Sequence, residues 1–126
     1  MREIKFRAWD TVMNKVLNLG DCKISIDLFG GIYDDEETPP RDVTYRTILM
    51  QYTGLKDKNG VEIYEGDILS GNWIVVWHEA GFYLHIPKLF SDTLYMPMSE
   101  KLEGEVIGNI YENPNLLEQS RKESNE

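Results

Sequence analysis

Short runs of alternating apolar and polar residues cover most of the chain and predict a protein built mainly from β-strands. Near the start, Ile4, Phe6 and Ala8 alternate with Lys5 and Arg7. The same alternation recurs over residues 16–19, 23–28 and 43–50. No run approaches the roughly 20 consecutive apolar residues that a transmembrane helix needs. The pattern therefore predicts strands and excludes a membrane-spanning helix.

The stretch 49–69 (LMQYTGLKDKNGVEIYEGDIL) contains the clearest hairpin signal. Asn59-Gly60 lies between apolar runs, and both residue types accept the positive φ of a tight turn. We therefore expect a reversal over residues 57–60, with positive φ at Gly60. A turn is also expected at Gly54. The residues Glu65-Gly66-Asp67 predict a further corner before a strand that starts at Ile68.

A second hairpin is expected over residues 72–87 (NWIVVWHEAGFYLHIP). A three-residue loop, Glu79-Ala80-Gly81, would pair His78 with Phe82 and would place Gly81 in the left-handed region. This register places the aliphatic residues of the hairpin together on one face. The other face would then carry Trp73, Trp77 and Tyr83, which are the candidate interaction residues of the chain.

The candidate chemistry of the chain is sparse. In the predicted register His78 and His85, the only histidines, project to opposite faces and cannot share a metal. Neither has a serine or cysteine placed beside it as a nucleophile. Cys22 is the single cysteine, so no internal disulfide forms, and we expect it to be buried packing. We therefore expect no enzymatic activity, no cofactor and no metal.

The remaining segments predict a loop, a bulge and a short helix. Acids and prolines over residues 33–42 are typical of a mobile loop. Gly108, within a strand expected over residues 105–111, indicates a bulge or a close approach of neighbouring backbone. Asn113-Pro114 suits a helix start, so a short helix with a frayed tail is expected over residues 114–126.

Length and charge narrow the function classes. The chain has 126 residues and a net charge of −9, concentrated in residues 34–42 and 112–126. This length fits one domain, residues 1–126. The lone cysteine and the charged N-terminus indicate a cytoplasmic protein without a signal peptide. An acidic surface disfavours nucleic acid as a partner, because phosphates attract lysine and arginine.

Three interpretations of the aromatic face remain open. It could be a second buried layer, because large aromatic residues dominate ordinary cores. It could be a protein–protein interface, since Trp and Tyr anchor such surfaces. It could also be a stacking platform for single-stranded nucleic acid, although residues 72–87 contain no lysine or arginine.

Three blocks carry a family resemblance: MREIKFRAWD at the start, LMQYTGLKDKNGVEIYEGDIL in the centre and VIGNIYENPNLL near the end. Together they resemble the YopX family of phage and prophage proteins. The resemblance implies a small β-rich protein with an SH3-like barrel in its C-terminal half, and it implies no activity or catalytic residue.

The expected fold is therefore mainly β, with N-terminal strands packed on a small SH3-like C-terminal barrel. Residues 1–53 would form the N-terminal part, residues 54–113 the barrel, and residues 114–126 the helix and tail. The expected function is that of a non-enzymatic phage or prophage accessory protein acting through protein–protein contacts. Its partners would be its own copies, as a homo-oligomer, or a host or phage protein. The alternative is a nucleic-acid-binding barrel.

Overall fold

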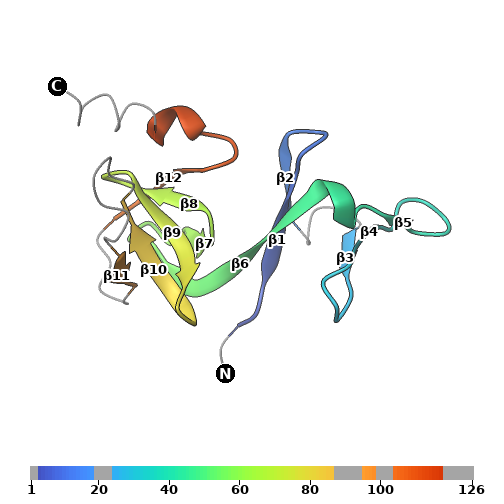
Figure 1. Cartoon of the computed structure of the whole chain (residues 1–126), viewed down its shortest axis with the longest axis horizontal. Helices are drawn as coiled ribbons and strands as arrows, with labels where there is room; N and C mark the ends of the chain where they lie inside the picture. The colour runs from blue at the N-terminus through green and yellow to red at the C-terminus, as the bar shows by residue number, and fades with distance from the viewer. Residues whose placement is uncertain (1–2, 19–23, 87–94, 99–103, 118–126) are drawn as a thin grey trace. The chain divides into compact units, whose positions relative to one another are not determined.

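The structure, a computed structural model of the chain, describes residues 3–18, 24–86, 95–98 and 104–117 (Figure 1). It is mainly β, with three antiparallel sheets. The chain separates into two compact units: unit 1 comprises Met1–Glu3 and Tyr52–Glu126, and unit 2 comprises Ile4–Gln51. The long strand β6 (Thr47–Lys56) begins in unit 2 and ends in unit 1.

In the first sheet of unit 2, an N-terminal hairpin lies beside β6. Strand β1 (Phe6–Asp10) pairs with β2 (Lys15–Asn18) and with the first half of β6, all antiparallel. Ala8 is fully buried, and its register partners are Leu17 and Leu49. The expected strands are thus confirmed, although the burial of β1 does not alternate, because Trp9 and Asp10 are buried next to Ala8.

The second sheet of unit 2 consists of β3 (Ile24–Ile26), β4 (Ile32–Asp34) and β5 (Arg41–Asp42). The expected loop over residues 33–42 is in fact a hairpin, because Tyr33 pairs with Asp42 and Asp34 with Arg41. Glu37 and Arg41 form an ion pair of 3.7 Å across its turn. The mobility expected for this segment stays a prediction. Cys22 lies outside the described residues.

The core of unit 2 lies between its two sheets. It consists of four buried residues and three partly buried ones: Ala8, Leu17, Ile32, Val43, Ile24, Ile26 and Leu49. A 3₁₀ turn, η1 (Thr44–Arg46), replaces the first half of the strand expected over residues 43–50. The reason is local hydrogen bonding: Asp42 and Val43 oxygens accept the backbone amides of Thr44 and Arg46.

Asp10 connects three segments of unit 2, although it is an acid with only 1 % of its surface exposed. Its Oδ1 accepts the amide hydrogens of Val12 (2.9 Å) and Met13 (3.0 Å) in the β1–β2 turn. Its Oδ2 lies 3.3 Å from Arg46 Nη2. A buried carboxylate is stable only when it is paired and hydrogen-bonded, and Asp10 meets both conditions.

Unit 1 is a curled half-barrel. Its main sheet has the strand order β11-β10-β9-β8-β12, and β7 pairs with the second half of β6 (Figure 1). The strands are β7 (Glu62–Tyr64), β8 (Asp67–Leu69), β9 (Trp73–His78), β10 (Gly81–His85), β11 (Tyr95–Pro97) and β12 (Val106–Asn109). Ile63, Leu69, Val75 and Leu84 form a core cluster of this unit, with 0–8 % of their surfaces exposed.

The predicted reversal at residues 57–60 is confirmed, and Gly60 has a φ of +82°. The side chain of Asp57 organises it: Oδ1 accepts the amide hydrogens of Asn59 and Val61, both at 2.9 Å. Oδ2 accepts the amide hydrogen of Val106 at 3.0 Å, and so connects the turn to β12. These amides, with Val106 first, hold the pKa of Asp57 below its usual value.

The turn expected at Gly54 is wrong. Gly54 has a φ of +88° but lies inside β6, where the pairing with β7 shifts between Tyr52 and Lys56. It is therefore a bulge residue, and the strand continues through it. The corner expected at residues 65–67 is confirmed, with a φ of +89° at Gly66 and the Tyr64 amide donating to Asp67 Oδ2 at 2.8 Å.

Gly108 is the expected site of close approach. The β8–β12 register shifts between Val106 and Gly108, and a Cβ on Gly108 would lie 2.7 Å from Asn113 Cγ. The Asn113 side chain occupies this place to accept the amide hydrogen of Asn109. The predicted helix follows over residues 114–117, and the expected tail lies outside the described residues. No helix in the described part of the chain is long and apolar enough to cross a membrane.

We expect Gly108→Ala to lower the free energy of unfolding by about 1–3 kcal/mol, because the added methyl must displace Asn113. Gly81→Ala is the matched control. Its Cβ would make only an ordinary contact of 3.5 Å with Tyr83, so it should change stability by less than about 1 kcal/mol. Urea denaturation of both variants measures the difference, and equal losses would contradict the close approach.

We expect Asp57→Asn to lower the melting temperature by roughly 5 °C at neutral pH. An amide in place of Oδ2 would face the Val106 amide, donor against donor. Because folding depresses the pKa of Asp57, its stabilisation is present above the unfolded pKa of about 3.9 and is lost as pH falls through the folded value. Thermal melts from pH 7 to pH 2 should show a shallower acid decline in the variant. Parallel declines would contradict this role.

Candidate functional site

The β9–β10 hairpin carries the candidate interaction residues, but its register differs from the prediction. His78 pairs with Gly81 and Trp77 with Phe82, so the loop has two residues, Glu79 and Ala80. These residues have φ values of +46° and +62°, whereas Gly81 does not have positive φ. The expected three-residue loop and the positive φ at Gly81 are therefore wrong.

The corrected register divides the three candidate residues between two faces. Trp73 and Trp77 share the inner face with Val75, Phe82 and Leu84, because strand residues two apart point the same way. Tyr83 pairs with Val76 and lies on the outer face. The expectation of one face carrying Trp73, Trp77 and Tyr83 is therefore wrong.

The inner face runs from buried core to exposed surface. Trp73 packs against the core, as the buried-layer interpretation expected for this face. Trp77 is 54 % exposed, and its ring meets Phe82 edge to face with ring centres 5.0 Å apart. Met96, which pairs with Leu84 from β11, is 47 % exposed. We call Trp77, Phe82 and Met96 the Trp77 surface.

The outer face holds a cluster of four rings: His78, Tyr83, His85 and Tyr95. The Tyr95 ring is nearly parallel to His78 (3.8 Å between ring centres, 2°) and to His85 (4.6 Å, 23°). Two rings cannot stack on the same side of a third at these distances, so Tyr95 lies between the histidines. Tyr83 meets His78 edge to face at 5.5 Å.

This stacking also corrects the expected placement of the histidines. They share a face of the hairpin rather than lying on opposite faces. They still cannot bind one metal, because the Tyr95 ring separates them. In the described residues no group of three or more His, Cys, Asp or Glu could hold a metal ion.

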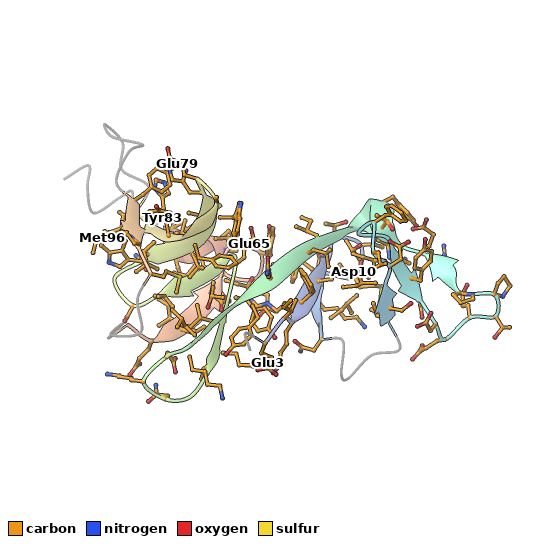
Figure 2. All side chains as sticks on the ribbon, turned by 90° about the horizontal axis from the view of Figure 1, so that it is seen from below. Glu3, Asp10, Glu65, Glu79, Tyr83 and Met96 are labelled. Atoms are coloured by element: carbon orange, nitrogen blue, oxygen red, sulfur yellow. The ribbon has the colours of Figure 1, made fainter. Side chains whose placement is uncertain are left out.

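The charge around the hairpin is slight and negative. Neither the described hairpin nor β11 contains a lysine or arginine. Glu79, at the exposed turn, is the charged residue of the hairpin, and its Oε1 lies 3.8 Å from His78 Nε2. Figure 2 shows Glu79, Tyr83 and Met96 around the same end of unit 1. In the described hairpin and β11, a polyanion would therefore meet no lysine or arginine.

Unit 2 contains a cavity of about 220 Å³ beside Asp10 and Arg46. Figure 2 shows Asp10 among the side chains of this unit. Both ionic side chains already serve the fold, since Asp10 Oδ1 accepts two backbone amide hydrogens and Asp10 Oδ2 lies 3.3 Å from Arg46 Nη2. The lining is mixed in charge: Asp10, Met13, Lys15, Leu17, Ile24, Asp34, Glu36, Val43 and Arg46.

Comparison with known proteins identifies the lineage. The family model described as YopX protein matches residues 5–118. The chain belongs to the YopX family. The structure is also similar to the crystal structure of protein EF1440 from Enterococcus faecalis, with a TM-score of 0.61 and 29 % sequence identity. That match covers 93 % of this chain and 99 % of the other. No curated protein matches the sequence.

Strand β11 of this YopX-family protein is not evident from its sequence. The sequence around Tyr95 and Met96 is typical of an irregular loop, because the apolar run is short and contains Pro97. Pro97 is compatible with β11 because this is an edge strand of the sheet. The sequence offers only Tyr95 near Pro97 as an indication of a strand, and an aromatic residue near a proline is found in strands and in loops.

The two tryptophans of the inner face should respond differently to truncation. We expect Trp73→Ala to cost about 2–4 kcal/mol of unfolding free energy, because it leaves a cavity against Val75 and Leu69. Trp77→Ala should cost less than about 1 kcal/mol, since that side chain is more than half exposed. Urea denaturation followed by circular dichroism measures both. A larger loss for Trp77 would mean that its ring belongs to the core.

Proposed function

We propose that this YopX-family chain is a non-enzymatic accessory protein of phage or prophage origin that works through protein–protein contacts, its own copies included. It would act in the bacterial cytoplasm as a homo-oligomer or bound to a host or phage protein. The observation that supports this most directly is the exposure of Trp77, 54 % of whose surface lies open.

The composition of the Trp77 surface favours a protein partner. A tryptophan, a phenylalanine and a methionine are the residue types enriched at protein–protein interfaces, and tryptophan is the strongest single anchor among them. Trp77 lies at the end of the inner face, beyond the four-residue core, so the fold does not require its burial. Covering Trp77 and Met96 would remove apolar surface from water.

Charge makes nucleic acid the second candidate rather than the first. The curled sheet of unit 1 resembles small barrels in general form, and we infer that it is an SH3-like barrel. Barrels of this size can stack bases on aromatic side chains. The Trp77 surface offers such rings, but its nearest charge in the hairpin is Glu79. Phosphates would therefore gain no counter-charge from the described hairpin and β11, whereas a protein partner does not need one there.

We expect Trp77→Ala to weaken self-association, or binding to a protein partner, by more than about 2 kcal/mol without unfolding the chain. Size-exclusion chromatography with light scattering, over a concentration series, would show a lower mass for the variant than for the wild type. Ile107→Ala is the matched control, because Ile107 is 42 % exposed on β12, at the other edge of the same sheet. It should keep the wild-type mass.

The outcomes separate the candidates. A wild type that stays monomeric at all concentrations and binds no protein partner would overturn the proposal. Fluorescence anisotropy with labelled single-stranded DNA tests the second candidate. Salt-sensitive DNA binding that Trp77→Ala abolishes and Ile107→Ala retains would favour a nucleic-acid-binding barrel.

A further inference from the structure

The β3–β4 hairpin of unit 2 ends in a loop that projects two large apolar side chains into solvent. Its residues 27–31 connect Ile26 to Ile32, which pair with each other. Leu28 and Phe29 have relative exposures of 102 % and 98 %. The next most exposed large hydrophobic residue in the described part of the chain is Tyr45, at 74 %. We call Leu28 and Phe29 the apolar tip.

Hydrogen bonds to Asp27 hold the loop in one conformation. Its Oδ1 accepts the amide hydrogens of Phe29 (2.9 Å) and Gly31 (2.8 Å), and its Oδ2 accepts the Tyr33 hydroxyl (3.0 Å). Its backbone N–H donates to the Gly31 carbonyl at 2.9 Å, and its carbonyl accepts the Gly30 amide at 3.1 Å. A loop ordered in advance loses less conformational entropy on binding than a flexible one.

Gly31 is required for this arrangement. A Cβ on Gly31 would lie 2.6 Å from Asp27 Oδ2 and 3.0 Å from the Tyr33 hydroxyl. Both distances are too short for a carbon atom, so a side chain at this position would break the contact between Asp27 and Tyr33. Gly31 therefore allows the loop to keep the conformation in which Leu28 and Phe29 are exposed.

The segment that carries the apolar tip is strongly acidic, and Asp42 pairs with Tyr33, whose hydroxyl contacts Asp27 in the loop. Residues 24–42 contain six acids and one base, Arg41. Arg41 is itself paired with Glu37. A partner of like charge would be repelled, and a partner with lysine or arginine near its binding pocket would be attracted.

We propose that the apolar tip is a second contact site, independent of the Trp77 surface, which inserts Leu28 and Phe29 into an apolar pocket with a basic rim on another protein. Two side chains exposed at a fixed hairpin end suit a concave partner, which can enclose both of them. A second copy of the chain fits poorly, because it would bring the same acidic segment. A bilayer with anionic lipids would repel those acids as well.

Site-specific photo-crosslinking tests the contact in bacterial cells that express the full chain. A photoreactive phenylalanine analogue at position 29 should give adducts with a cellular protein, whereas the analogue at position 12 should not. Val12 is a matched position, because it is 59 % exposed in the same unit. The adduct is identified by mass spectrometry, and that protein is then purified.

Binding of the purified partner gives the decisive measurement. The double variant Leu28→Ser/Phe29→Ser should weaken affinity at least about 30-fold, the size expected when the central anchors of an interface are lost. Val12→Ser should leave affinity unchanged. Gly31→Ala should weaken it several-fold while both apolar residues and every charge remain. Wild-type affinity should fall as salt rises, because the attraction between acids and basic rim is screened.

Four results would overturn the proposal. The first is the absence of protein adducts at position 29. The second is an adduct with another copy of this chain. The third is binding of the wild type to vesicles of phosphatidylglycerol and phosphatidylethanolamine that the double variant loses. The fourth is a purified partner whose affinity the double variant does not change.

Discussion

The carboxylate of Asp57 is the contact on which unit 1 depends most. Through Oδ1 it fixes the turn between β6 and β7, and through Oδ2 it holds the first residue of β12, which lies 49 positions further along the chain. Only a short side chain with two acceptor oxygens can serve a turn and a distant strand together. The curled sheet therefore closes around an ionised group that lies almost entirely out of water.

Aspartate carboxylates fix turns in unit 2 as well. Asp10 fixes the β1–β2 turn and pairs with Arg46, and Asp27 fixes the loop between β3 and β4. Each carboxylate accepts hydrogen bonds from backbone N–H groups, which offset its negative charge at the buried Asp10 and fix the loop at the exposed Asp27. Part of the acidic excess of this YopX-family protein is therefore structural. The rest is concentrated in residues 34–42 and 112–126.

The β9–β10 hairpin shows how core packing can override local turn preferences. Glu79 and Ala80 both adopt positive φ, a conformation that costs energy for residues other than glycine. The register that results places Val75 opposite Leu84, and both are core residues with at most 8 % exposure. A shift by one residue would move this pair to opposite faces, so burial decides the register. The same register leaves Trp77 exposed and places the Tyr95 ring between His78 and His85.

The sequence by itself determined the β class, the reversal at residues 57–60, the close approach at Gly108 and the helix start after Asn113. These features depend on residues within a few positions of each other, and glycine and asparagine at those positions are sufficient to predict them. It could not determine the register of the second hairpin, the strand at Tyr95, the burial of Asp10 beside Arg46 or the exposure of Leu28 and Phe29. The first three depend on contacts between distant segments: the core under Val75, the edge of β10 and the turn before β6. The exposure of Leu28 and Phe29 follows from the local hydrogen bonds of Asp27, which the alternation of apolar and polar residues does not reveal. Only the tertiary structure decides the first three, because the free energy of contacts between distant segments exceeds the small local preferences that a sequence pattern records.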